Sequence, residues 1–309
     1  MIINAPIDLE LTQSSGQTSQ PPWKLNNNVY SDVVLVDNKP VLFQVKQENN
    51  NLDFDFIGDI SNNQAAKKIK TIFDLDFNLD KFYKYLNNQP ELADMTNFCR
   101  DLRLFLAKDK FECVISSICS ANNSIARWTK SIDDIKKSWG NKHTYDNLDY
   151  FTFPDIFSFK KIYCDDLEEL ECCTHIKNLD SCINNLKTCG VGYRAQYMRG
   201  ASEIFTLEMD LDDISKMSYE EAFEEILKVP GVGPKVADCI LLYGFNFKQA
   251  FPSDVWIKRI VSYLYFDNKD VSVSKIREFG IEEFGDYAGY VQLYLFHYAR
   301  MSGLMKKLK

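Results

Sequence analysis

Hydrophobic and polar positions follow two different periods along the chain. Apolar runs at 33–36, 41–45 and 52–56 are separated by Asn-rich turns, and the last run alternates apolar with acidic residues. Such alternation is typical of strands with one buried face. The first hundred residues therefore predict an antiparallel meander, followed by a helix over 79–86.

From about residue 108 the apolar positions recur at helical spacing. This spacing predicts helices over 111–128, 132–139, 166–174, 180–187, 193–204, 219–228, 235–244, 255–266, 274–284 and 287–302. The pattern favours an α+β protein with two domains. We expect an N-terminal antiparallel β-sheet domain over 1–105 and a larger, all-helical domain over 106–309.

Charge and cysteine usage narrow the function classes. The 309 residues carry 36 Lys and Arg against 44 Asp and Glu, a net charge of −8, so any binding to nucleic acid must use a local basic patch. No apolar stretch approaches 18 residues and no signal peptide is evident, so we expect no membrane contact. Nine cysteines without a CxxC pair indicate reduced thiols in a cytoplasm and argue against zinc or iron–sulfur sites.

The most informative stretch is 227–239, LKVPGVGPKVADC. An amphipathic helix ends near Pro230, and Pro234 is suited to the first turn of a second helix. Gly231 and Gly233 let the intervening turn bring its N–H groups close to a phosphate, and the helix N-terminus adds further donors. The stretch predicts a helix–hairpin–helix that grips a nucleic-acid backbone; an ordinary helix junction with a glycine cap is the alternative.

Two residues near this hairpin suggest chemistry. Lys235 lies in the first turn of the second helix, where the positive end of the dipole and any burial would lower its pKa and favour the nucleophilic amine. Asp254 is predicted to cap the helix that begins at Val255, which would hold its carboxylate in a fixed orientation. Taken singly, each residue is better explained as a solvated lysine or a plain cap, but together with the hairpin the two favour a catalytic role.

Four motifs in order resemble the 8-oxoguanine DNA glycosylase/AP lyases of the helix–hairpin–helix (HhH-GPD) superfamily. They are the hairpin itself, CSANNSIAR at 119–127, GVGYRA at 190–195 and YAGYVQLYLF at 287–296. The resemblance covers nearly the whole chain. It implies that Lys235 attacks C1′ of the damaged nucleoside and forms a Schiff base that permits β-elimination, while Asp254 stabilises the positive charge developing on the sugar.

The resemblance also implies a pocket for a base flipped out of the duplex. Cys239 and Phe296 match the residues on the two faces of the base, and Gln292 matches the amide that reads its pairing edge. Gly16 matches the glycine whose carbonyl accepts the N7–H found on 8-oxoguanine. The family usually continues with an aromatic residue, a basic residue and Trp, whereas TSQPPW follows here at 18–23.

Further residues match positions that contact DNA in the family. Asn122 would fill the vacated space, Tyr193 would wedge beside the partner base, and Arg127 with Arg194 would bind an orphaned cytosine through its acceptors. The resemblance therefore implies a preference for cytosine opposite the lesion.

Helix 255–266 and the hairpin complete the expected DNA contacts. Trp256 stands where some members place a phosphate-contacting His, and it keeps one N–H donor, while Lys258 can add charge. The acidic runs, including 210–213, should face away from the DNA. No cofactor is required, but the family allows a structural cation at the hairpin carbonyls of Leu227, Val229 and Val232.

Three other readings stay open. The chain could be a monofunctional glycosylase that uses Asp254 and water, a noncatalytic helix–hairpin–helix module, or a helical protein-interaction domain. In the favoured reading the partner is duplex DNA containing 8-oxoguanine, bound by a monomer. The Asn-rich turns and the lack of a basic nuclear-localisation run favour the cytoplasm of a prokaryote, at the nucleoid.

Overall fold

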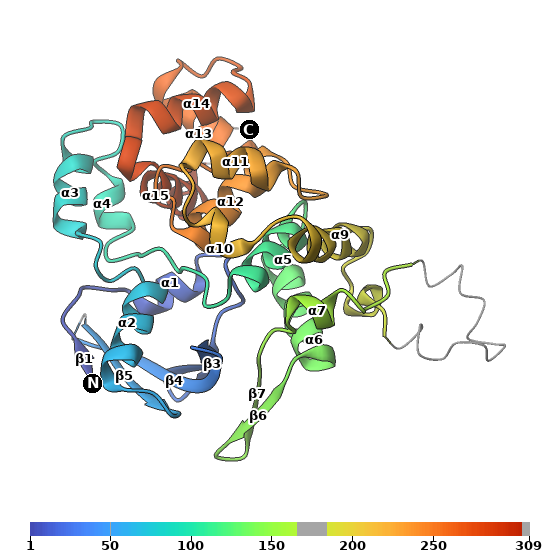
Figure 1. Cartoon of the computed structure of the whole chain (residues 1–309). Helices are drawn as coiled ribbons and strands as arrows, with labels where there is room; N and C mark the ends of the chain where they lie inside the picture. Colours follow the sequence, from blue (N-terminus) through green and yellow to red (C-terminus); the bar gives the residue numbers. More distant parts are fainter. Residues whose placement is uncertain (50, 166–183, 305–309) are drawn as a thin grey trace.

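A computed structural model describes residues 1–49, 51–165 and 184–304 (Figure 1). An antiparallel five-stranded sheet lies at one end of the molecule, in the order β1-β5-β4-β3-β2, and helices form the remainder. The elements of the N-terminal third are β1 Ile2–Ile3, α1 Leu9–Ser14, β2 Lys24–Asn26, β3 Val29–Val36, β4 Lys39–Glu48, β5 Asn51–Ile57, α2 Asn62–Ile72, α3 Leu79–Asn87 and α4 Met95–Phe98.

The predicted meander is confirmed. β3 pairs with β4, and β4 with β5, in antiparallel register. Asp37 and Asn38 join the first pair with φ of 50° and 63°, the left-handed conformation that a tight two-residue hairpin turn requires. The sheet packs against α2, and Trp23, Phe73 and Phe105 form an edge-to-face and stacked aromatic cluster in this core.

The helical part confirms the expected α+β class. Its elements are α5 Lys110–Ser120, α6 Ile125–Trp139, β6 Lys142–Tyr145, β7 Leu148–Phe151, α7 Ile156–Phe159, η2 Leu186–Cys189, α9 Arg194–Leu207, α10 Leu211–Ile214, α11 Tyr219–Leu227, α12 Pro234–Phe245, α13 Val255–Tyr265, α14 Val273–Phe284, η3 Gly285–Tyr287 and α15 Ala288–Met301. None of the described helices is both long and apolar enough to cross a bilayer.

Several predicted boundaries were wrong. The helix expected over 111–128 is broken at 121–124, because Asn122 adopts a φ of 49° and Ser124 caps a new helix, α6, that runs through the gap expected at 129–131. The β6–β7 hairpin and α2 were not predicted from the sequence. The helix expected over 166–174 and the first half of that expected over 180–187 lie outside the described residues, and η2 begins at Leu186 in the described half.

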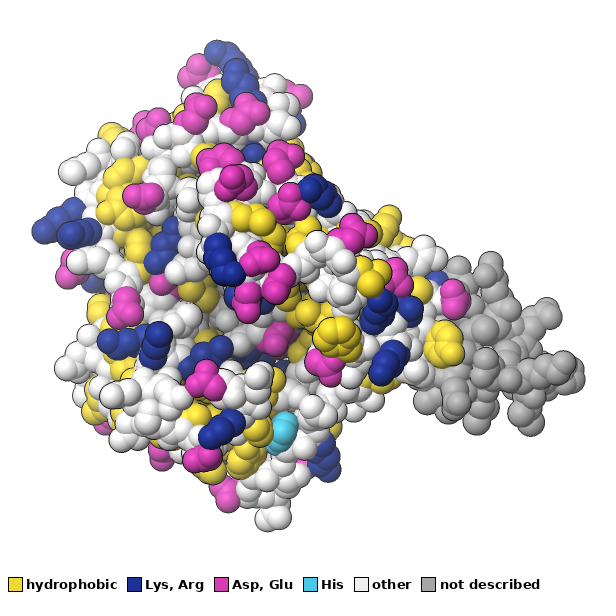
Figure 2. Space-filling view, in the orientation of Figure 1, with side chains coloured by type: hydrophobic (Ala, Val, Ile, Leu, Met, Phe, Trp, Pro, Cys, Tyr) yellow, Lys and Arg dark blue, Asp and Glu magenta, His cyan; other side chains and the backbone are white. Residues whose placement is uncertain are grey.

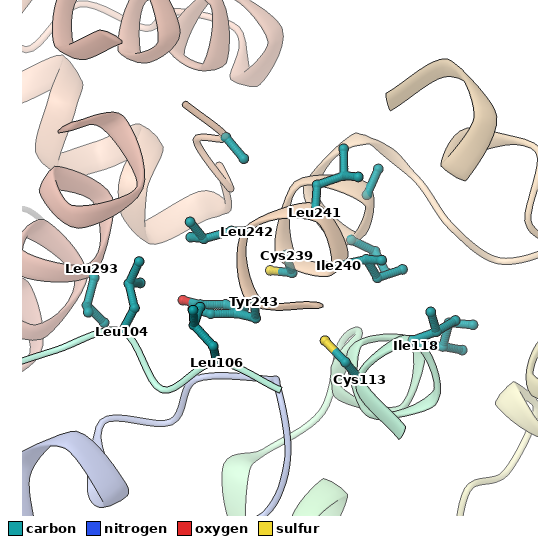
Figure 3. Packing of buried hydrophobic residues seen from close by; sticks show 14 of the residues in the cluster. Leu104, Leu106, Cys113, Ile118, Cys239, Ile240, Leu241, Leu242, Tyr243 and Leu293 are labelled. Carbon is teal, nitrogen blue, oxygen red and sulfur yellow. The ribbon is translucent and has the colours of Figure 1, made fainter. Parts of the chain in front are cut away.

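Helix α12 runs through the main hydrophobic core, between α5 and α15 (Figure 3). Figure 3 shows Cys239 and Tyr243 on α12, with Leu293 of α15 and Cys113 of α5 close by. The residues of α3 and α4 also pack in this core. The domain boundary at 105/106 stays a prediction.

A buried polar cluster fixes α12 against its neighbours. Asp238 is fully buried and accepts hydrogen bonds from Arg277 Nε at 2.6 Å and from the Tyr219 hydroxyl at 2.5 Å. Arg277 Nη2 also donates to that hydroxyl at 2.6 Å. Since Tyr219 lies on α11 and Arg277 on α14, this cluster holds both helices of the hairpin in place.

A second buried cluster joins the sheet to α5 and α6. Asp32 of β3 forms ion pairs with Lys108 and, at 3.5 Å, with Lys136 of α6. The attraction of Lys108 and Lys136 outweighs the cost of burial and holds the pKa of Asp32 below its usual value. The cluster fixes the sheet relative to the helices.

Candidate active site and DNA-binding groove

The predicted helix–hairpin–helix is present between α11 and α12. Gly231 has a φ of +75°, and a Cβ at this position would lie 2.4 Å from Cγ of Tyr197. Gly233 caps α12 without a side-chain acceptor, and Pro234 occupies the first turn. The first N–H groups of a helix have no intrahelical partner, so this end of α12 can receive a phosphate oxygen.

Lys235 extends from the first turn of α12 and is partly buried. Burial lowers its pKa, but attraction to Cys239 and to the Asp254 carboxylate raises it by more, so the net pKa lies above the usual lysine value. The expected lowering of this pKa was therefore wrong, because the expectation considered the helix dipole and burial but not the opposing effects of Cys239 and Asp254. Lys235 rests as an ammonium and must lose a proton before it can act as a nucleophile.

Asp254 is the N-cap of α13, as predicted. Its Oδ1 accepts hydrogen bonds from the backbone N–H groups of Trp256 and Ile257, each at 2.9 Å. No described residue donates a hydrogen bond to Oδ2. One oxygen therefore fixes the carboxylate while the other is available to the charge on Lys235 or on a substrate.

A small cavity of about 60 Å³ gathers both predicted catalytic residues and all four predicted base-pocket residues. Its lining includes Gly16, Lys235, Cys239, Asp254, Gln292 and Phe296. These residues come from the loop after α1 and from α12, α13 and α15. Segments up to 280 residues apart in sequence thus converge on one small space.

Gln292 and Gly16 present polar groups at this cavity. Gln292 is only 7% exposed, and none of the described residues donates a hydrogen bond to its Oε1. A buried oxygen without a donor costs roughly 1–3 kcal/mol unless water or a ligand satisfies it. The carbonyl of Gly16 likewise accepts no hydrogen bond from the described part of the chain.

Hydrogen bonds from the neighbouring Gln17 hold the loop around Gly16, although its sequence departs from the usual family pattern. Gly16 has a φ of +82°, and a Cβ there would lie 2.4 Å from Cδ1 of Ile125. Gln17 is buried, and its side-chain amide forms two hydrogen bonds with the backbone of 103–105. Its Nε2 donates to the Arg103 carbonyl at 3.0 Å, and its Oε1 accepts from Phe105 N–H at 2.8 Å. This local geometry requires none of the missing aromatic and basic residues.

The cavity shares five lining residues with a groove of about 1030 Å³. Charged residues lining the groove are Arg127, Lys235, Arg300 and Asp254, which gives three cations against one carboxylate. Arg300 is bound to the Ser15 carbonyl, so Arg127 and Lys235 provide the local basic surface that the acidic chain needs in order to bind DNA.

Acidic residues gather elsewhere. A separate hollow over α10 and α11 is lined by one lysine and the five carboxylates of Asp213, Glu220, Glu221, Glu224 and Glu225, and Figure 2 shows this magenta cluster. None of them lines the groove.

The residues predicted to contact the opposite base differ in their exposure to solvent. Asn122 and Arg127 line the groove and are exposed. Arg194 is buried; its Nε donates to the Ala121 carbonyl and its Nη2 to the Asn122 carbonyl, both at 2.8 Å. In this structure Arg194 therefore holds the turn that carries Asn122.

The remaining predicted contacts surround this region. Tyr193 is 57% exposed and packs edge-to-face on Tyr197. Trp256 is 44% exposed and lines the groove. Lys258 forms an ion pair with Asp270 at 2.6 Å and does not line the groove.

Of the carbonyls expected at a cation, that of Leu227 belongs to the last residue of α11, and those of Val229 and Val232 lie in the turn that follows. Val229 O already accepts a hydrogen bond from Val232 N–H at 3.1 Å and keeps a second lone pair. Within the described ranges no three His, Cys, Asp or Glu side chains could jointly hold a metal. The backbone cation site stays a prediction.

Sequence reasoning missed two residues that contact the site. Thr18 lines both the cavity and the groove, and its hydroxyl hydrogen-bonds that of Ser117 at 3.1 Å. Arg300 lies over Phe296. Arg300 follows Gln292 and Phe296 at intervals of eight and four residues, a helical spacing that could have identified it.

The sequence of this chain is similar to those of known DNA repair proteins. Residues 2–114 match the N-terminal domain of 8-oxoguanine DNA glycosylase, and residues 115–283 match HhH-GPD superfamily base excision DNA repair proteins. The chain belongs to the 8-oxoguanine glycosylase/lyases of the HhH-GPD superfamily. It is 44% identical to a probable N-glycosylase/DNA lyase of Methanothermobacter thermautotrophicus over 98% of this chain and 96% of the relative.

Solved structures agree in fold. The 8-oxoguanine glycosylase/lyase of Clostridium acetobutylicum, bound to duplex DNA with cytosine opposite 8-oxoguanine, is 28% identical, with a TM-score of 0.79 and 98% of each chain covered. A 3-methyladenine DNA glycosylase of Archaeoglobus fulgidus, 21% identical, shares the fold with a TM-score of 0.77 over 98% of this chain and 99% of its own. The fold alone therefore does not determine the damaged base, and the site must.

Proposed function

We propose that this protein excises 8-oxoguanine from duplex DNA and then cleaves the abasic strand by β-elimination. The observation that carries the proposal is the convergence of Lys235, Asp254 and the base-pocket residues on one cavity that opens into a cationic groove. The names of the similar N-glycosylase/DNA lyases point to the same pair of activities.

Lys235 supplies the nucleophile in this proposal. Its neutral amine attacks C1′, and the N-glycosidic bond breaks with its electron pair going to the base, which is then protonated. The sugar ring opens to give an imine between Nζ and C1′. Loss of a C2′ proton expels the 3′ phosphate, because the imine accepts the electrons. These steps use side chains of the chain and no cofactor.

Asp254 acts electrostatically. Positive charge develops at C1′ as the base departs, and a carboxylate fixed by two backbone N–H groups is already oriented to stabilise it. The same charge raises the pKa of the nearby lysine, so Lys235 must pass its proton on before it attacks. Catalysis is thus expected to depend on pH through Lys235.

The damaged base is read by four groups. Cys239 and Phe296 pack on its faces, the Gln292 amide reads its pairing edge, and the Gly16 carbonyl accepts the N7–H that guanine lacks. The cavity of about 60 Å³ is smaller than typical ligand pockets of about 300–1,000 Å³, so its side chains must move apart to admit the base.

Cytosine is the proposed partner of the lesion. Arg127 is exposed in the groove and can donate to the cytosine acceptors, while Asn122 fills the space left by the flipped base. Arg194 can reach cytosine after exchanging a backbone carbonyl for the base. Single-turnover excision opposite C, A, G and T tests this preference, and equal rates would contradict it.

The chain's own variants test the chemistry. Wild-type protein should release 8-oxoguanine and nick the strand, whereas Lys235→Gln should bind the same duplex and do neither. Base release without a nick by the wild type would favour the monofunctional reading centred on Asp254. DNA binding with no release from any damaged duplex would favour a noncatalytic module.

We further propose that the protein acts as a monomer on cytoplasmic, nucleoid DNA of a prokaryote. The similarity to an archaeal relative over nearly the full length supports this setting. Sedimentation of the protein with a lesion duplex would test the stoichiometry, and two chains per lesion would contradict it.

A further inference from the structure

Arg300 bridges two parts of the candidate base pocket. It lies in the last turn of α15, where its Nη1 donates a hydrogen bond to the Ser15 carbonyl at 3.2 Å. Its guanidinium carbon lies 5.4 Å from the centre of the Phe296 ring. The side chain therefore joins the loop after α1 to the helix that carries Gln292 and Phe296.

The bridge acts on one side of the Gly16 loop. Gln17 fixes the other side of the loop through the backbone of residues 103 and 105. Arg300 occupies the Ser15 carbonyl, whereas no described residue donates to the carbonyl of Gly16. Arg300 Nη1 would also lie 3.5 Å from a Cβ at Gly16, so the guanidinium and the glycine are close neighbours.

We propose that Arg300 is a positioning residue that determines specificity for the lesion. By occupying the Ser15 carbonyl and lying over Phe296, it holds the Gly16 carbonyl ready for the N7–H of 8-oxoguanine and fixes the ring that packs on the base. This inference rests on the proposed function. It predicts that Arg300 contributes to base excision and not to cleavage of an abasic strand, which has no base to read.

Two substitutions test what the guanidinium of Arg300 contributes. Arg300→Met keeps a long apolar side chain but removes the hydrogen bond and the cation, whereas Arg300→Lys keeps one cationic donor. Lys216→Ala is the matched control for charge, because Lys216 is exposed and lies beside α10, away from the groove. Each variant is compared in single-turnover 8-oxoguanine excision, cleavage of a preformed abasic site, and affinity for undamaged duplex at several salt concentrations.

Arg300→Met should reduce 8-oxoguanine excision about tenfold, equivalent to about 1.4 kcal/mol, a size typical of a hydrogen bond to a charged group. The rate of abasic-site cleavage and the affinity for undamaged duplex at each salt concentration should change less than about twofold. Arg300→Lys should recover part of the excision rate.

An equal loss of excision and abasic-site cleavage would overturn the assignment. So would weaker binding to undamaged DNA with a salt slope reduced by about one, which would identify Arg300 as a phosphate contact. Unchanged excision by Arg300→Met would also refute it. If the wild type itself cleaves abasic DNA but releases no 8-oxoguanine, the proposed substrate fails, and the inference about its recognition fails with it.

Discussion

The two hairpin glycines should respond differently to substitution. Gly231 has a φ of +75° and faces the Tyr197 ring, while Gly233 has a φ of −98° and nothing within 4 Å of a Cβ. We therefore compare Gly231→Ala with Gly233→Ser. Serine is a favoured N-cap residue, so it adds a side chain at the phosphate-facing turn without weakening α12.

The magnitudes follow from these surroundings. An L-residue in the left-handed region costs roughly 1–2 kcal/mol, and a Cβ at 2.4–2.7 Å from three atoms of Tyr197 must displace the ring or the hairpin. Gly231→Ala should therefore lower the free energy of unfolding by about 2 kcal/mol or more. Gly233→Ser should leave it within about 0.5 kcal/mol of the wild type.

Urea denaturation and fluorescence anisotropy with a duplex carrying an uncleavable abasic analogue measure both effects. We expect Gly233→Ser to weaken DNA binding about tenfold at unchanged stability, because its side chain occupies the approach to the hairpin N–H groups. Gly231→Ala should lose both affinity and stability. In the Gly231→Ala/Tyr197→Ala double variant the backbone strain and the 2.7 Å contact with Cβ of residue 197 remain, while the clash with the ring is relieved, so only part of the stability loss should be recovered.

Wild-type affinity in Gly233→Ser would refute the view that the hairpin binds the DNA backbone. A stability loss in Gly233→Ser as large as that in Gly231→Ala would refute the assignment of strain to the left-handed glycine.

Three further predictions concern the site and its supports. Burial lowers the pKa of Lys235, but Cys239 and Asp254 raise it by more. The single-turnover rate of abasic-site cleavage should therefore rise with pH as the ammonium loses its proton, and Asp254→Asn should shift this pH profile to lower pH. An unshifted profile would contradict the electrostatic coupling between Asp254 and Lys235. Arg277→Met should cost about 3–5 kcal/mol in urea denaturation, because it leaves the buried Asp238 carboxylate unpaired, and a loss below 1 kcal/mol would contradict this role. Gln292→Leu should leave the melting temperature unchanged or higher, since it removes a buried oxygen without a donor, yet reduce 8-oxoguanine excision; normal excision would exclude Gln292 from base recognition.

The sequence was sufficient to predict the elements with strong local signals. Alternation and Asn-rich turns identified the meander, and helical spacing identified most of the helices. The Gly/Pro-rich turn identified the hairpin, and Asp254 was recognised as a cap. These features depend on neighbours within a few residues, which a sequence pattern displays directly.

Features that depend on distant contacts were not predictable in this way. The break at Asn122 is stabilised by Arg194, more than seventy residues later, and the raised pKa of Lys235 depends on an aspartate brought close by the fold. The loop at Gly16 departs from the usual family sequence, and buried amides such as Gln17 supply its support. Lys235 and Asp254 were singled out from the sequence itself, but Gly16, Cys239, Gln292 and Phe296 were assigned through resemblance to the family, since the pattern alone favours a core cysteine and phenylalanine with a surface glutamine.

Covalent trapping tests the central claim most directly. Borohydride is added to the protein with a duplex that contains one 8-oxoguanine opposite cytosine, with wild type and Lys235→Gln side by side. The proposed mechanism predicts a covalent protein–DNA adduct with the wild type alone, because reduction fixes the imine between Nζ of Lys235 and C1′. Release of the base without an adduct, or an adduct of equal yield with Lys235→Gln, would contradict Lys235 as the nucleophile.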